Sequence, residues 1–93
     1  MLFRSLVEIE VRCAFLELDE PRLGAVAGEL AAAGVSVIRI VPMFLGAGRH
    51  AREDLPRLVE ACRRLHPAVT FDLRPSVGED PRLLDLLGTI AAE

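Results

Sequence analysis

The sequence predicts an α/β domain in which a parallel sheet of three strands carries helices on both of its faces. Apolar and β-branched residues cluster at residues 7–15, 35–41 and 69–73, as expected for strands. Each of these runs is followed by a segment in which apolar residues recur every three or four positions, as expected for helices. Because strands joined by helical crossovers pair in parallel, the predicted order is β-α-β-α-β-α.

The first half of the chain is predicted to form a strand, a helix and a second strand. Apolar residues alternate with Glu8, Glu10 and Arg12 in residues 7–15, which indicates a strand with one solvated face. Asp19 or Glu20 is expected to cap a helix that starts at Pro21 and ends at Gly34. Residues 35–41 are apolar on both sides, so this strand is predicted to be central in the sheet.

The second half repeats the pattern with clearer boundaries. Asp54 is expected to cap a helix that ends before Pro67. Residues 69–73 alternate between apolar and polar, as in a strand at the edge of a sheet. Asp80 and Pro81 form a cap and a first-turn pair, which begins a last helix with an apolar stripe of Leu83, Leu84, Leu87 and Ile90.

Composition excludes several classes of function. The 93 residues carry a net charge of −3, and all eleven basic residues are arginine, so no continuous basic face for nucleic acid is expected. Charged residues interrupt every apolar stretch before it reaches the ~20 residues that span a bilayer. We expect a single soluble domain in the cytoplasm, with no membrane contact. Cys13 and Cys62 form no C-x-x-C motif and are expected to be buried, reduced thiols.

The segment of residues 41–56 is the best candidate for a functional site. It follows the second predicted strand, and ligands of α/β proteins usually bind beyond the carboxyl ends of strands. His50 lies in this segment, and Glu17 follows the first strand, so the two side chains are predicted to share one edge of the sheet. An imidazole and a carboxylate suit Co²⁺, Fe²⁺, Ni²⁺ or Zn²⁺, and both accept protons near neutral pH. The alternative is an ordinary surface histidine and a glutamate that only complements a helix dipole.

Other polar residues near this segment allow two interpretations each. Arg49 and Arg52 flank His50 and are candidates to bind carboxylates of a ligand, or they are simply solvated arginines. Gly46 and Gly48 match neither phosphate-binding pattern, G-x-x-x-x-G-K-[ST] or G-x-G-x-x-G, and are interpreted as a flexible turn beside a flat ligand. His66 falls in a last helical turn, where a cation complements the carbonyl end of the helix.

An ordered series of short motifs resembles one known family. The motifs are AFLEL at residues 14–18, EP at 20–21, VPMFL at 41–45, GRH at 48–50, DLP at 54–56, HP at 66–67 and GEDP at 78–81. Together they resemble the small sirohydrochlorin chelatases, which are class II chelatases that insert cobalt in the anaerobic cobalamin pathway or iron in sirohaem synthesis. The resemblance extends from about residue 7 to the last helix.

The resemblance implies a fold, a reaction and roles for residues. It implies a chelatase-like, flavodoxin-like sheet, and a lyase that inserts Co²⁺ or Fe²⁺ into sirohydrochlorin without an organic cofactor. His50 matches the histidine of the G-x-H motif that binds metal and accepts protons, and Glu17 matches a glutamate that helps to hold the metal. Arg49 and Arg52 are then candidates to bind the carboxylates of the tetrapyrrole. The resemblance, together with the exposed strand edges, also leads us to expect a homodimer.

The chain departs from the family pattern at its beginning. The family begins with a strand that leads into a His-Gly-Ser segment, which supplies a second catalytic histidine, and neither is found here. Residues 1–93 are therefore expected to be a single domain truncated at its N-terminus. Three arrangements are open: the remaining strands pair directly, another chain supplies a strand, or the natural start lies upstream. The alternative function is a non-catalytic module that binds metal or tetrapyrrole.

Overall fold

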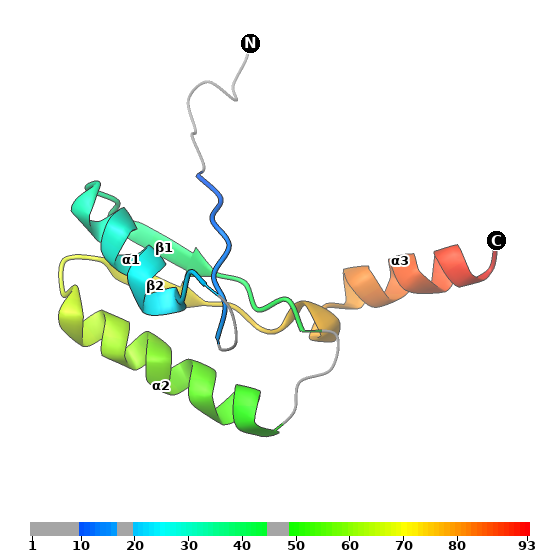
Figure 1. Ribbon diagram of the computed structural model, residues 1–93. Helices are drawn as coiled ribbons and strands as arrows, with labels where there is room; N and C mark the ends of the chain where they lie inside the picture. Colours follow the sequence, from blue (N-terminus) through cyan, green and yellow to red (C-terminus); the bar gives the residue numbers. More distant parts are fainter. Residues whose placement is uncertain (1–9, 17–19, 45–48) are drawn as a thin grey trace, which may run out of the picture.

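The computed structural model describes residues 10–16, 20–44 and 49–93, with the backbone alone described for residues 49–52. The elements follow one another as α1 (Leu23–Ala32), β1 (Val37–Ile40), α2 (Arg49–Leu65), β2 (Thr70–Leu73), the 3₁₀ helix η2 (Val77–Glu79) and α3 (Pro81–Ala91). Figure 1 shows α1 and α2 beside the sheet, while α3 extends away from it.

The two described strands pair in parallel, which confirms the predicted α/β class. Val37 is opposite Thr70, and Ile40 is opposite Leu73. Helix α2 connects the two strands, as a parallel crossover requires. Alternation in β2 was predicted correctly, since Phe71 is buried and Thr70 is exposed. In the described part of the chain β1 pairs with β2 alone, so the prediction of a central β1 is wrong there.

One buried cluster joins both strands to α1 and α2. Ile38 and Phe71 are opposite each other in the sheet and point to the same face. The cluster is completed by residues of the two helices, namely Val26, Ala27 and Leu30 of α1 and Leu55, Val59 and Cys62 of α2. Helices α1 and α2 therefore cover the same face of the sheet, whereas the sequence predicted helices on both faces.

The strand predicted at residues 7–15 is absent from its described part. Residues 10–14 have no regular structure, and Phe15 forms a single parallel bridge with Arg22. A strand is stable only where a neighbour completes its backbone hydrogen bonds, and no described strand lies beside this segment. Residues 7–9 lie outside the described residues. The described sheet thus has two strands instead of the predicted three.

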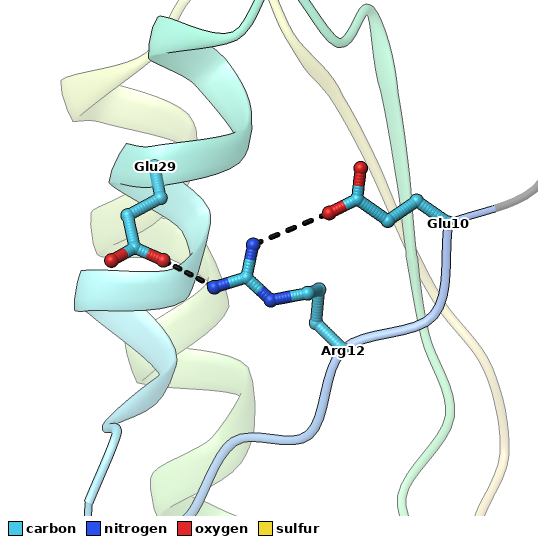
Figure 2. Close-up of polar contacts among 3 residues, drawn as sticks. All are labelled: Glu10, Arg12 and Glu29. Atoms are coloured by element: carbon cyan, nitrogen blue, oxygen red, sulfur yellow. Dashed lines mark hydrogen bonds and ion pairs between the residues drawn. The ribbon is translucent and has the colours of Figure 1, made fainter.

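An arginine connects this first segment to α1. The guanidinium of Arg12 lies between two carboxylates: it bonds to Glu29 of α1 and lies 3.3 Å from Glu10 (Figure 2). Hydrogen bonds to Glu29 and then to Glu10 raise the pKa of Arg12 above its ordinary value. Because these side chains are exposed, the contact positions the segment more than it stabilises the fold.

Helix boundaries match the sequence signals only in part. Gly34 has a φ of 88°, the left-handed conformation expected after a helix, and follows α1 as predicted. Asp80 caps α3 by accepting a hydrogen bond of 2.8 Å from the backbone N–H of Arg82, also as predicted. Helix α1, however, begins at Leu23 after Arg22, not at Pro21, and Arg22 makes no side-chain cap. The glutamate-proline pair precedes the helix as a cis peptide.

No helix in the described part of the chain is long and apolar enough to span a bilayer.

Candidate functional site

The segments that follow β1 and β2 continue side by side beyond the sheet. The backbone N–H of Arg74 donates to the carbonyl of Ile40 at 2.9 Å, and that of Val77 donates to Pro42 at 2.9 Å. The carbonyl of Phe44 accepts from the N–H of Gly78 at 2.8 Å and from the hydroxyl of Ser76 at 2.6 Å. Hydrogen bonds therefore hold the two segments together beyond the carboxyl edge of the sheet, as far as Phe44.

In the sequence, His50 follows shortly after this edge, at the start of α2. Phe44 is separated from the start of α2 by residues 45–48, and His50 is the second residue of the helix. The sequence predicted that His50 precedes a helix capped by Asp54, and that boundary is wrong. Asp54 is an exposed residue inside α2, and Pro56 lies in the helix interior.

The early start of α2 has a local explanation. Residues 49–54 contain Ala, Arg and Glu, which are good helix formers, and they directly follow a glycine. Pro56 weakens the helix at its own position, since proline lacks the N–H that helix interiors require. The packing of Leu55, Val59 and Cys62 in the buried cluster outweighs this penalty and holds the helix on both sides of Pro56.

The convergence of the His50 and Glu17 side chains at one edge of the sheet remains a prediction. Glu17 lies outside the described residues, as do the side chains of Arg49, His50 and Arg52. What the structure does establish is backbone position: His50, with Arg49 and Arg52, belongs to the first turn of α2, beyond the carboxyl end of β1. This is the region of a parallel α/β sheet where ligands bind.

The described residues add features of this edge that the sequence did not single out. Met43 is 76% exposed, although its neighbours Pro42 and Phe44 turn inward. Ser76 holds the backbone of Phe44, and Arg74 lies 4.0 Å from Asp72, at the limit of an ion pair. The alternation of β1 between its two faces continues through Val41, Pro42, Met43 and Phe44. This pattern could have predicted from the sequence that Met43 is exposed.

Other candidate groups fall outside this edge. Among the described residues no group of three or more His, Cys, Asp or Glu side chains lies together in a way that could hold a metal ion. Cys62 is buried, as predicted, and burial raises the pKa of its thiol, but Cys13 is exposed, which contradicts its predicted burial. His66 follows α2, with its ring 6.4 Å from that of Phe71.

Comparison with known proteins gives a consistent set of relatives. A family model described as CbiX matches residues 1–93. A sirohydrochlorin cobaltochelatase of Sulfurisphaera tokodaii is 30% identical over 77 residues, which are 83% of this chain and 61% of that protein. Another, of Methanosarcina barkeri, is 38% identical over 52 residues, which are 56% of this chain and 40% of that protein.

A solved structure supports the same relationship. The crystal structure of a CbiX protein of Marinobacter aquaeolei VT8, described under cobalamin (vitamin B12) biosynthesis, matches with a TM-score of 0.75 at 35% identity. The match covers 85% of this chain and 65% of the other. The chain thus spans about 60% of the length of the Sulfurisphaera tokodaii relative and less of the Methanosarcina barkeri one.

Proposed function

We propose, from the premise that this chain belongs to the CbiX family, that it inserts a divalent metal ion into sirohydrochlorin. The relatives reported above are named sirohydrochlorin cobaltochelatases, which favours Co²⁺ as the metal and leaves Fe²⁺ as the second candidate. The proposed products belong to cobalamin or sirohaem biosynthesis. The metal and the tetrapyrrole are both substrates, and no organic cofactor is needed.

The observation that carries this proposal is the position of His50 in the first turn of α2. That turn follows the carboxyl end of β1, whose backbone is bonded to the segment after β2 as far as Phe44 and Gly78. A neutral imidazole is the form that binds a metal ion or accepts a proton.

The chemistry requires two tasks that these residues can share. Insertion replaces two pyrrole protons of the macrocycle with one divalent ion, so the ion must be delivered and two protons accepted. We assign metal binding to His50 and Glu17 and proton acceptance to His50. We propose that Arg49 and Arg52 bind the carboxylates of the macrocycle, because arginine binds carboxylates in two-point contacts and a helix start attracts anions.

We also propose that the chain acts as a homodimer. The described sheet has two strands, and each of them is unpaired on its outer side among the described residues. Open strand edges favour association with another chain.

The experiment is anaerobic metal insertion, followed by the visible absorption of sirohydrochlorin with Co²⁺ or Fe²⁺. We expect insertion above the spontaneous rate, and a loss of about 10²–10⁴-fold in the variant His50→Ala, as for removal of a proton-transfer group. His66→Ala is the matched control, because it removes the other histidine, which lies beyond the opposite end of α2. Glu17→Gln is expected to weaken Co²⁺ binding, while Glu60→Gln leaves it unchanged.

Two outcomes separate the proposed enzyme from a non-catalytic module. If the protein gives no insertion above the spontaneous rate but binds Co²⁺ in a way that His50→Ala abolishes, the chain is a metal-binding module. If equal losses follow from His50→Ala and His66→Ala, the assignment of His50 is wrong.

A further inference from the structure

The carbonyl of Phe44 accepts two hydrogen bonds from the segment that follows β2. The backbone N–H of Gly78 donates to it at 2.8 Å, and the hydroxyl of Ser76 donates to it at 2.6 Å. The bond from Ser76 is partly buried and joins residues that are 32 positions apart in the sequence. Phe44 is the last described residue before α2. The hydroxyl of Ser76 therefore holds the point from which the chain leaves the sheet towards α2.

The local position of Ser76 does not explain what its hydroxyl does. Ser76 is the N-cap residue of η2, and a serine at this position usually accepts a hydrogen bond from the first turn of its own helix. Ser76 makes no such cap, and its hydroxyl donates to Phe44 instead. The N–H of Gly78 alone would satisfy the carbonyl of Phe44. The second bond, which uses the other lone pair, therefore fixes the direction of this carbonyl.

The first turn of α2, which contains His50, is held only weakly by the helix itself. The first residue of α2 in the buried cluster is Leu55, five residues after His50, or about 7.5 Å further along the helix axis. Pro56 has no N–H, so the carbonyl of Arg52 lacks its usual partner within the helix. The position of the first turn therefore depends in part on how the chain enters α2 from the sheet.

The chain starts towards α2 from a fixed point. Phe44 packs against the buried cluster, and Pro42 is buried and accepts a hydrogen bond of 2.9 Å from the N–H of Val77. The segments after β1 and β2 lie side by side as far as η2 (Figure 1). Residues 45–48, which lie outside the described residues, connect Phe44 to α2. Because this connection is short, the orientation of Phe44 limits where the first turn of α2 can lie.

We propose that Ser76 is a positioning residue for His50. The hydroxyl of Ser76 fixes the carbonyl of Phe44, and this bond holds the entry to α2 in the place where His50 can bind a metal ion. The inference rests on the role proposed above for His50. We assign Ser76 no direct contact with the metal ion or the tetrapyrrole.

Loss of the Ser76 hydroxyl is expected to displace His50 without unfolding the chain. Ser76→Ala keeps the hydrogen bond from Gly78 and every residue of the buried cluster. Loss of a group that orients a metal ligand weakens metal binding by about 10–100-fold. We expect the lower end of this range, because the bond from Gly78 remains.

The first test observes the ring of His50 by NMR, without metal or tetrapyrrole. The chain has two histidines, and His66 follows α2 at its other end, so its ring is an internal reference. In Ser76→Ala we expect the nitrogen–proton correlations of the His50 ring to shift or broaden, while those of His66 stay as in the native chain. In Ser76→Thr, which keeps a hydroxyl, both rings are expected to give native signals.

Thr89→Ala is the matched control. The hydroxyl of Thr89 also donates to a backbone carbonyl, that of Asp85 at 3.1 Å, but this bond lies within α3. The variant is expected to leave the signals of both histidines unchanged. Urea denaturation of each variant verifies that it is folded under the conditions of the NMR measurement.

The second test measures Co²⁺ binding by titration calorimetry. Ser76→Ala is expected to raise the dissociation constant for Co²⁺ about tenfold, as for a group that orients a metal ligand. Ser76→Thr is expected to restore the native value, and Thr89→Ala is expected to keep it. Restoration by threonine would show that the hydroxyl, and not the size of the side chain, is what matters.

The outcomes separate this inference from the function proposed for His50. Native signals of His50 in Ser76→Ala would overturn the inference, and so would equally large changes at His66, which would indicate a general loosening of the fold. A displaced His50 with native Co²⁺ affinity would show that Ser76 has no part in metal binding. If His50 responds as expected but the native chain neither binds nor inserts a metal ion, Ser76 does position His50 and the function proposed for His50 is wrong.

Discussion

At the scale of single residues, the two cysteines show how much depends on surroundings. Cys62 points from α2 into the buried cluster and is 4% exposed, whereas Cys13 is exposed in the segment before α1. Both have apolar neighbours in the sequence, so local composition assigned them the same environment. The packing of α2 on the sheet, which the sequence does not state, separates them.

We predict that only Cys13 reacts with a thiol reagent in the folded chain. Burial removes Cys62 from the reagent and raises the pKa of its thiol, which lowers the fraction of reactive thiolate. With 5,5′-dithiobis(2-nitrobenzoate) at pH 8, one thiol should react quickly and the second only after unfolding. The Cys13→Ser variant should lose the fast phase. Rapid reaction of both thiols in the native protein would contradict the buried position of Cys62.

At the scale of elements, the sequence predicted a helix boundary correctly where a side chain forms a hydrogen bond with the backbone of the helix. Asp80 and Pro81 predicted the start of α3 because the aspartate side chain accepts a bond from the helix itself. Asp54 was predicted to cap α2 in the same way, and that prediction is wrong, because α2 already begins at Arg49 in a stretch of good helix formers. An aspartate thus marks the start of a helix only where the residues before it do not themselves favour the helix.

We predict that the carboxyl of Asp80 titrates at a pH of about 2. Hydrogen bonds from the side chain and then from the backbone N–H of Arg82 lower the pKa of Asp80 from its ordinary value to about 2. Since the folded pKa is below the unfolded one, the stabilisation is complete above about pH 4 and is lost as the pH falls towards 2.

The titration is measured by NMR of the Asp80 carboxyl carbon. Arg82→Ala should move the midpoint upward, because it removes the largest cause of the shift and leaves the backbone bond. Asp85→Asn, on the same helix, should leave the midpoint unchanged. A native midpoint near 4 would show that the cap is not formed in solution.

At the scale of the whole molecule, stability rests on one buried cluster shared by α1, β1, α2 and β2. Val59 is at its centre and is 0% exposed. A domain of this size is stable by only about 5–14 kcal/mol, so loss of a few methyl groups is a large fraction of the total. Helix α3 lies outside this cluster.

We predict that Val59→Ala lowers the free energy of unfolding by about 2–3 kcal/mol. The estimate combines about 0.8 kcal/mol for each buried carbon removed with the cavity that remains. Leu65→Ala, at a residue that is 73% exposed, should change it by no more than about 0.5 kcal/mol. Urea denaturation followed by circular dichroism measures both. Equal effects of the two substitutions would contradict a single core centred on α2.

The sequence by itself determined the features that depend on periodicity and local chemistry. The alternation of residues 69–73, the glycine after α1 and the cap of α3 were all predicted from a few neighbouring residues. The series of motifs also indicated the chelatase family, and the comparisons confirmed it. The position of His50 after a strand and beside a helix was also predictable, because it depends only on the order of the elements along the chain.

Only the tertiary structure decided which segments face each other. It paired β1 directly with β2, placed α1 and α2 on the same face and left residues 10–14 without a strand. These outcomes depend on contacts between segments far apart in the chain, which share no local pattern. A strand needs a neighbour for its hydrogen bonds and a helix needs a surface for its apolar face, and neither partner is visible in the residues of the element itself.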